Sequence, residues 1–163
     1  EATGPNPTDR ARPGTKHHVL VDGQGVPLAV SITGANVPDI MQLLPLVVAV
    51  PAVGGKPGHP RSRPKRLYAD RAYDSEPARC ILRWLGIEPM LAKRGTQHGS
   101  GLGRFRWVIE RTISWLHQQR RLRVRYERRA DIHSGFLTLA ASLICLVPPP
   151  NSWVVVAKTR AWW

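Results

Sequence analysis

The pattern of apolar and polar residues predicts a β-hairpin near the start of the chain. His17–Val21 has the composition of a short strand, and Val26–Thr33 alternates along its length as a second strand. Asp22 and Gly23 lie between these strands and are typical of a tight turn. Residues 1–16 are rich in Pro, Gly and Thr, which predicts a loop before the hairpin.

Two short strands with a helix between them are predicted in the middle of the chain. Arg66–Asp70 and Ile87–Ala92 are apolar segments of strand length. Ser75 is a favourable N-cap for a helix that runs to about Leu85, and Gly86 is a typical residue to end that helix.

Three more helices are predicted from the spacing of apolar residues. One covers Ile40–Val50 and begins near Pro38 and Asp39, which are both favourable in a first helical turn. Apolar residues at i, i+3 and i+4 predict an amphipathic helix over Phe105–Leu116, and an apolar helix covers Asp131–Val147. Together these elements predict a mixed α/β sheet with helices packed on it.

Charge narrows the class of partner. The 163 residues include 24 Lys and Arg against 11 Asp and Glu, which gives a net charge of +13. Such a charge favours nucleic acid or an anionic membrane surface, and the small number of acids favours nucleic acid. The apolar runs are shorter than the roughly 20 residues of a membrane span. Two cysteines exclude a disulfide scaffold, and 42% hydrophobic residues argue against disorder.

The basic residues concentrate in a Gly- and Pro-rich surface loop, at RSRPKR (61–66), and in residues 104–129. Lys and Arg bind phosphate groups, and the counterions that they release make such binding sensitive to salt. The residues predicted to contact phosphates are Arg61, Arg63, Lys65, Arg66, Arg104, Arg111, Arg120, Arg121, Arg123, Arg125, Arg128 and Arg129.

Four aromatic residues are interleaved with the second basic segment. Phe105, Trp107, Trp115 and Tyr126 either stack on splayed bases or pack in a hydrophobic core. Their helical spacing favours core packing.

Two of the acids stand out as candidates for chemistry. Asp70 ends a predicted buried strand, where α/β sheets place functional groups. Glu110 lies beside the apolar stripe of a helix, with Arg106 and His117 on the same face. An Arg106–Glu110 pair stabilises a helix by roughly 0.2–0.5 kcal/mol, which is the structural interpretation. In the functional interpretation, Arg106 holds Glu110 toward a site shared with Asp70, where carboxylates and phosphates bind a divalent metal ion.

The chain resembles DDE-class transposases of bacterial insertion sequences, of the group-five insertion-sequence type. Two motifs carry the resemblance: LYADRAYDS around Asp70 and GSGLGRFRWVIERTISWLHQQRRLRVRYERRADIH around Glu110. Residues 3–40 are also similar, so the resemblance spans about Thr3 to Leu146. It implies a ribonuclease-H-like mixed sheet flanked by helices over residues 1–147, with residues 148–163 as an unassigned tail.

The resemblance also implies DNA strand cleavage and strand transfer with Mg²⁺ or Mn²⁺. Asp70 and Glu110 match two of the three acids that ligate the metal, and Tyr73, Arg106 and His117 occupy accessory positions. The sequence departs from the family at Gly103, where a Tyr is common, and at His117, where a Lys is common. The implied partners are transposon ends, target DNA and further copies of the chain on DNA, in the bacterial cytoplasm and without a membrane.

The first catalytic Asp of the family belongs to a strand before the hairpin, which this sequence does not include. Asp9 lies in a loop and is a poor substitute. We therefore expect a missing or incomplete first strand, an exposed sheet edge and poor solubility. Two alternatives remain: a DNA-binding remnant without catalysis, and a basic structural protein associated with RNA.

Overall fold

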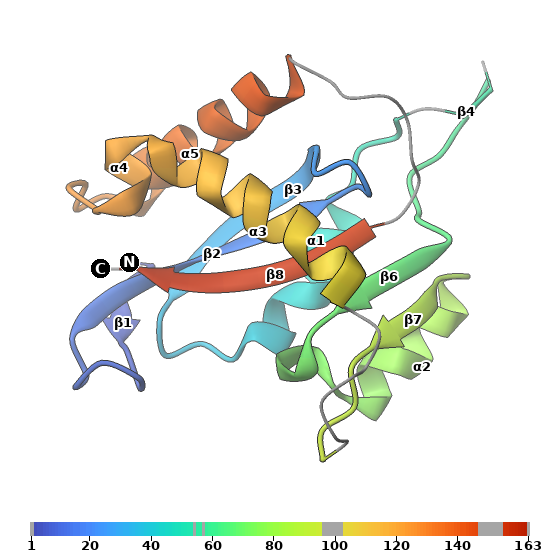
Figure 1. Ribbon diagram of the computed structural model, residues 1–163, viewed down its shortest axis with the longest axis horizontal. Coiled ribbons are helices and arrows are strands. Elements are labelled where there is room, and N and C mark those ends of the chain that lie inside the picture. Colours follow the sequence, from blue (N-terminus) through green and yellow to red (C-terminus); the bar gives the residue numbers. More distant parts are fainter. Residues whose placement is uncertain (1, 54, 57, 96–102, 147–154, 163) are drawn as a thin grey trace.

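The computed structural model describes residues 2–53, 55–56, 58–95, 103–146 and 155–162 (Figure 1). These residues form a six-stranded mixed sheet with helices on both faces, and a separate pair of two-residue strands, β4 (Gly55–Lys56) and β5 (His59–Pro60). This architecture confirms the predicted α/β class.

The predicted hairpin is present as β2 (Pro13–Val21) and β3 (Pro27–Gly34), which pair antiparallel. The carboxylate of Asp22 accepts hydrogen bonds from the backbone N–H groups of Gln24 at 2.8 Å and Val26 at 2.9 Å. Gly25 has a φ of +87°, a conformation that glycine adopts without steric cost. The turn therefore depends on an aspartate and a glycine, as its sequence predicted, although the glycine is Gly25.

β2 begins at Pro13, inside the segment that was predicted to be a loop. Its first two residues pair with β1 (Gly4–Pro5), and its remaining residues pair with strands on both sides. Tertiary pairing of this kind can hold a Pro- and Gly-rich segment extended, which local composition does not signal.

β6 (Arg66–Ala69) and β7 (Glu88–Leu91) are parallel, and α2 (Glu76–Trp84) connects them after the short 3₁₀ helix η2 (Arg71–Tyr73). Both strands and α2 agree with the prediction. Gly86 follows α2 with a φ of +77°, as expected for a helix C-terminus. Ser75 holds the N-cap position of α2, but its side chain makes no capping hydrogen bond, which corrects the predicted cap.

The C-terminal tail supplies a central strand of the sheet. β8 (Val155–Trp162) pairs antiparallel with β2 and parallel with β6, so the strand order runs β2-β8-β6-β7, with β3 on the other side of β2 (Figure 1). The sequence had left this segment unassigned. Because β8 fills the position between β2 and β6, the expected exposed edge is not present there.

The predicted helix over residues 40–50 is shorter in the structure. A 3₁₀ turn, η1 (Asp39–Gln42), precedes α1 (Leu43–Val48). Pro45 has no N–H to donate to the preceding turn, so α-helical hydrogen bonding cannot extend upstream of the first turn of α1.

The remaining helices are α3 (Gly103–Gln118), α4 (Arg120–Arg123) and α5 (Ala130–Cys145). α3 and α5 correspond to the two predicted helices, and α4 is an additional short turn. Residue Val147, the predicted end of the last helix, lies outside the described residues.

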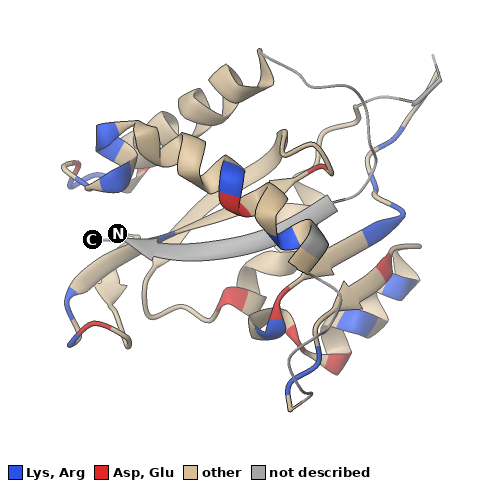
Figure 2. Cartoon of the chain, viewed as in Figure 1, with Lys and Arg blue, Asp and Glu red and all other residues tan. Residues whose placement is uncertain are grey.

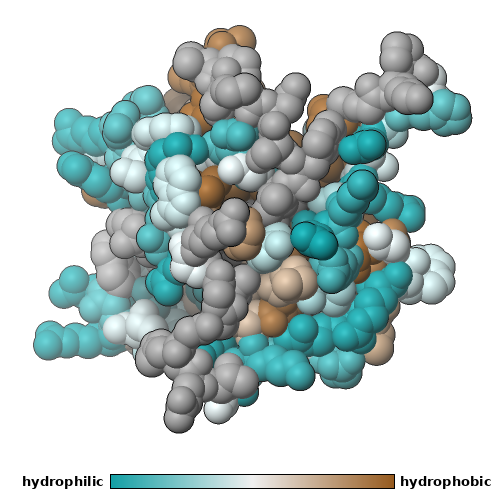
Figure 3. All heavy atoms as spheres, turned by 45° about the vertical axis from the view of Figure 1, so that its right-hand side comes forward, coloured by the Kyte–Doolittle hydropathy of each residue, from teal (hydrophilic) through white to brown (hydrophobic). Residues whose placement is uncertain are grey.

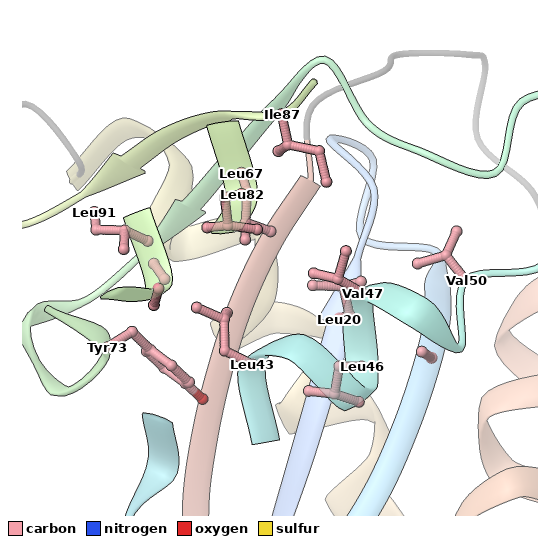
Figure 4. Close-up of a cluster of buried hydrophobic side chains, with 13 residues drawn as sticks. Leu20, Leu43, Leu46, Val47, Val50, Leu67, Tyr73, Leu82, Ile87 and Leu91 are labelled. Atoms are coloured by element: carbon pink, nitrogen blue, oxygen red, sulfur yellow. The ribbon is translucent and has the colours of Figure 1, made fainter. Parts of the chain in front are cut away.

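The sheet separates two hydrophobic cores. Leu20 faces the first core, which α1, α2 and the strands β6 and β7 enclose (Figure 4). Val19 and Val21 face the second core, which lies under α3 and α5. Successive residues of β2 therefore serve opposite faces, as expected for a buried central strand. Each fully buried aliphatic side chain contributes roughly 1.5–3 kcal/mol.

Two of the sequence observations concern the cysteines and the length of the apolar runs. Cys80 and Cys145 are exposed and carry free thiols. Within the described ranges, no helix has the length and apolar character needed to cross a membrane.

Candidate functional site

Asp70 directly follows β6 and is exposed. Its carboxylate accepts a hydrogen bond from the backbone N–H of Ala72 at 2.9 Å and so caps η2. A strand-end aspartate at an N-cap has a local structural role in addition to any chemistry. The sequence analysis had not identified this capping role.

A partly buried ion pair between Arg79 and Asp74 holds the chain that follows Asp70. The guanidinium of Arg79 donates to the carboxylate of Asp74 at 2.6 Å and to the carbonyl of Leu91 at 3.0 Å. The second carboxylate oxygen of Asp74 accepts the backbone N–H of Arg94 at 2.8 Å. The hydrogen bonds from Arg79 and Arg94 lower the pKa of Asp74.

This network links the loop after β6, helix α2 and the end of β7. The sequence analysis singled out neither Asp74 nor Arg79. The sequence signal for this ion pair is the spacing of Asp74 and Arg79, which are five positions apart across the first turn of α2. With hydrogen bonds to Arg79 and to the backbone of Arg94, Asp74 can hold this loop in place.

Glu110 is carried by α3, and the predicted pair with Arg106 is present. Arg106 Nε lies 2.9 Å from a carboxylate oxygen of Glu110, and both side chains are largely exposed. An exposed pair of this kind contributes only about 0.3–0.5 kcal/mol. The pair therefore fixes the orientation of Glu110 more than it stabilises the fold.

The β2–β3 turn fastens α3 to the sheet. The hydroxyl of Thr112 donates to the carbonyl of Gly25 at 2.7 Å, and Arg111 donates to the carbonyl of Gln24. Thr112 is fully buried. These contacts fix the rotation of α3 about its axis, and this rotation decides which way Glu110 faces.

The elements that carry Asp70 and Glu110 both contact β8. β6 pairs with β8, and α3 packs against β8 from the front in Figure 1. The last paired positions of the two strands are Ala69 and Ala157, and Asp70 follows directly after Ala69.

The described side chains do not fit a metal site. No group of three or more His, Cys, Asp or Glu side chains that could hold a metal ion occurs within the described residues. Asp70 caps η2, and Glu110 is paired with Arg106. The expected Mg²⁺ or Mn²⁺, and the meeting of the two acids around it, stay predictions.

Tyr73 and His117, two residues at the accessory positions, lie in different environments. Tyr73 is completely buried and packs in the first core, among Leu43 and Leu91 (Figure 4). His117 is partly buried, with its ring centroid 5.9 Å from that of His17. The structure thus gives Tyr73 a packing position and places His117 beside a buried histidine cluster.

The predicted basic residues are distributed over separate parts of the molecule. Figure 2 shows Lys and Arg at the start of β6 and on α4, at opposite ends of the molecule. The face in Figure 3 is covered mainly by hydrophilic residues. Members with exposed side chains in these segments are Arg61, Arg63, Lys65, Arg66, Arg120, Arg121, Arg123, Arg128 and Arg129.

Three of the residues that were predicted to contact phosphates are not among the exposed members. Arg125 donates to backbone carbonyls of Ala2 and Glu127 and to the hydroxyl of Thr15, and so ties the N-terminal segment to the chain before α5. Arg111 is partly buried against the β2–β3 turn. The side chain of Arg104 lies outside the described set. Phosphate binding by these three residues stays a prediction.

The aromatic residues divide into buried and exposed members. Phe105 packs in the second core against Tyr68, with ring centroids 4.2 Å apart, as predicted. Trp107 and Trp115 are instead 52% and 36% exposed, so the core interpretation is wrong for them. The guanidinium of Arg111 lies 4.6 and 4.8 Å from their ring centroids, which are cation–π distances.

Tyr126 is also exposed, at 54%, and lies close to Arg120. Helical spacing alone does not distinguish the buried face of a helix from its flank. The correction for these aromatic residues therefore required the tertiary structure.

Comparison with known proteins gives the family. Residues 2–145 match the model of the transposase DDE domain. A Burkholderia cepacia protein, named as the candidate transposase for insertion sequence element IS402, is 64% identical over 143 residues, which cover 88% of this chain and 68% of that protein. No solved structure matches the chain. Asp70 and Glu110 both lie inside the matched region, and the chain belongs to the transposase DDE-domain family.

Proposed function

We propose that this chain acts on DNA as the catalytic-type domain of an insertion-sequence transposase, with Asp70 and Glu110 at its reacting centre. The observation that carries the proposal is the family match over residues 2–145, which includes both acids. DNA transposition is the function of this family. The mixed sheet with helices on both faces supports a ribonuclease-H-like fold for residues 1–147, to which β8 adds a strand.

The surrounding residues support distinct roles for the two acids. Arg106 holds Glu110 on the exposed side of α3, and the Asp74–Arg79 pair holds the loop that begins at Asp70. The family generally uses divalent metal ions. No step is assigned to a metal ion, because the described His, Cys, Asp and Glu side chains form no group of three or more that could hold one.

DNA contact is assigned to the two exposed basic segments. Arg61, Arg63 and Lys65 precede β6, while Arg120 and Arg123 belong to α4. A net charge of +13 favours binding to phosphates, with an affinity that falls as salt rises. Because the start of β6 and α4 lie at opposite ends of the molecule, we infer that a DNA partner contacts both ends or that two DNA segments bind. The proposal includes binding of transposon ends and target DNA by several copies of the chain.

The role of Glu110 can be tested by strand cleavage in a transposase that carries this domain. Glu110→Gln keeps the size of the side chain but removes its charge, and we expect cleavage to be lost while DNA binding stays within about twofold. Glu88→Gln is the matched control, because Glu88 is also exposed and paired with an arginine, at 2.7 Å from Arg66. Cleavage that survives in Glu110→Gln would contradict the assignment.

A second candidate function is DNA binding without cleavage by this 163-residue chain. It is favoured by the absence of a metal-capable group of three side chains within the described residues. We expect no nicking of supercoiled DNA with Mg²⁺ or Mn²⁺ beyond that of Glu110→Gln. Robust nicking that depends on Glu110 would exclude this candidate.

DNA binding itself can be tested by fluorescence anisotropy. Arg123→Glu should weaken binding to a duplex and flatten its salt dependence, since it removes a phosphate contact and adds repulsion. Arg12→Glu, an exposed position outside both basic segments, makes the same change in net charge and should have the smaller effect. Equal effects would indicate that charge acts only globally. Tighter binding to RNA than to DNA at matched salt would instead favour an RNA-associated protein.

A further inference from the structure

Among the described residues of α3, two tryptophans lie outside both hydrophobic cores. Trp107 and Trp115 are exposed on the same helix, which crosses one face of the molecule (Figure 1). An indole is one of the largest apolar groups that a fold can bury, so a single exposed tryptophan is ordinary but two on one side of a helix indicate a contact surface.

Arg111 joins the two indoles into one stacked array. Residues four positions apart share one side of a helix, and the guanidinium of Arg111 lies over the rings of both Trp107 and Trp115. Arg111 also donates to the carbonyl of Gln24 in the β2–β3 turn, so the guanidinium is held from the sheet as well. The rings are therefore held in place before a ligand binds, which lowers the conformational entropy lost on binding.

One face of the Trp107 ring is left uncovered by the described residues. The guanidinium of Arg111 covers the face on the C-terminal side. Long side chains on a helix lean toward its N-terminus, so the other face lies toward the preceding turn, which contains Gly103. Gly103 is exposed and has no side chain, and a Cβ added there would meet nothing within 4 Å.

The uncovered face lies beside Glu110 and near basic groups. Glu110 is three positions after Trp107, and residues at this spacing are neighbours on a helix surface. Arg106, which pairs with Glu110, is largely exposed. A flat apolar ring next to guanidinium groups suits a ligand that combines an aromatic face with negative charge.

Unpaired nucleotides are ligands of this kind. A base that has left the duplex can stack on an aromatic side chain, while its phosphates are attracted to basic groups. A base inside a duplex presents only its edge in the grooves, so it cannot stack on the ring. The array therefore distinguishes unpaired from paired DNA.

We propose that Trp107, supported by Arg111 and Trp115, is a stacking site for an unpaired DNA base beside Glu110. The proposal rests on the proposed function in one respect, since it takes DNA as the partner of this chain. It goes further by naming the state of that DNA. Every base has an aromatic face, so the site selects unpaired DNA and not a particular sequence.

Fluorescence anisotropy with the full chain tests the proposal on three DNA probes of equal length and equal phosphate number. The first probe is fully paired, the second contains a central stretch of mismatched bases, and the third has abasic sites in that stretch. We expect the mismatched probe to bind about fivefold or more tightly than the paired probe, and the abasic probe to show no such preference. An abasic probe that binds as tightly as the mismatched probe would overturn the proposal, because backbone flexibility would then explain the preference.

Trp107→Ala should remove the preference and leave the affinity for the paired probe within about twofold, because no phosphate contact is lost. Trp107→Phe keeps a smaller aromatic ring and should retain part of the preference. Trp84→Ala is the matched control, because Trp84 is 84% exposed on α2, which packs in the core on the other face of the sheet. A full preference in Trp107→Ala, with folding checked by circular dichroism, would overturn the proposal.

The outcomes separate this proposal from the proposed function. Equal binding of the unmodified chain to the paired and mismatched probes would overturn the stacking site and leave DNA binding intact. Absence of binding to all three probes would contradict both proposals. These comparisons use the unmodified chain, so they do not depend on the folding of a variant.

Discussion

At the scale of single residues, exposure and local hydrogen bonding modify what each residue type suggests. Asp70 lies exposed at the end of its strand, and it also caps η2. Trp107 and Trp115 share the helical spacing of Phe105 but lie on the exposed flank of α3. The residue type indicates which chemistry is possible, and the environment decides which of the possible roles is filled.

Buried histidines are a further property of this scale. Nε2 of His17 lies 2.8 Å from Nε2 of His133, and both side chains are almost fully buried. Burial, together with the charges of His133 and His117, lowers the pKa of His17 to about 3. Burial lowers the pKa of His18 to about 4, with Asp39 partly offsetting this effect.

These shifts predict a loss of stability in mild acid. The pKa of each histidine is lower in the folded state than its ordinary value of 6.5, so the unfolded chain takes up more protons below that pH. Stability is therefore complete above about pH 6.5 and falls as the pH drops toward 4. The slope is at most about 1.4 kcal/mol per pH unit for each histidine. The free energy of unfolding, measured by urea denaturation at pH 7, 6 and 5, gives this slope.

His17→Asn should make this slope shallower, because one titrating group is removed. The pH range from 7 to 5 lies above the range in which Asp74 and Glu127 affect stability. The pKa values of both acids are lowered in the folded state, so they affect stability only below their ordinary values of 3.8 and 4.5. Stability that is flat from pH 7 to 5 would contradict the prediction.

At the scale of elements, the hairpin and the helices α2, α3 and α5 could be predicted because their signals are local. The composition of β2, the alternation of β3 and the apolar stripe of α3 are read from adjacent residues. The same local signals do not show that the β2–β3 turn packs on α3 through Gly25 and Thr112. This contact joins segments 87 residues apart, and it helps to fix the direction of Glu110.

Gly25→Ala should test this contact. A Cβ at Gly25 would lie 2.7 Å from the hydroxyl of Thr112, and the φ of +87° is unfavourable for alanine. We expect a loss of roughly 2–4 kcal/mol in the free energy of unfolding, from backbone strain and overpacking together. Gly86→Ala is the matched control, since Gly86 has a φ of +77° with nothing within 4 Å of the added Cβ.

The control should lose only the backbone part, about 1–2 kcal/mol. Chemical denaturation of both variants gives the difference. Equal losses would indicate that the turn does not press against α3 and that it has no part in orienting Glu110.

At the scale of the whole molecule, the principal finding is that the end of the chain lies at the centre of the sheet. β8 is the neighbour that β2 and β6 share, so the sheet depends on residues that are more than 80 positions away in sequence from β6. An unfilled position here would leave two exposed edges, and unpaired strand edges promote aggregation.

Ala157→Pro should therefore destabilise the whole fold. Ala157 pairs with Leu20 on one side and with Ala69 on the other, and proline removes the backbone donor of a central strand. We expect a loss of at least about 3 kcal/mol in the free energy of unfolding. Ala52→Pro, at an exposed position outside helices and strands, should cost much less. Cooperative unfolding at unchanged stability in Ala157→Pro would contradict a central role for β8.

The sequence by itself determined the local elements, the positive charge and the two motifs that carry Asp70 and Glu110. These features depend on neighbouring residues and on composition, so they are present before any folding. The tertiary structure alone decided that the tail becomes β8, that β8 lies between β2 and β6, and that Trp107 is exposed. Strand order and register arise from hydrogen bonds between distant segments, and the energy of such pairing is not encoded in any one segment.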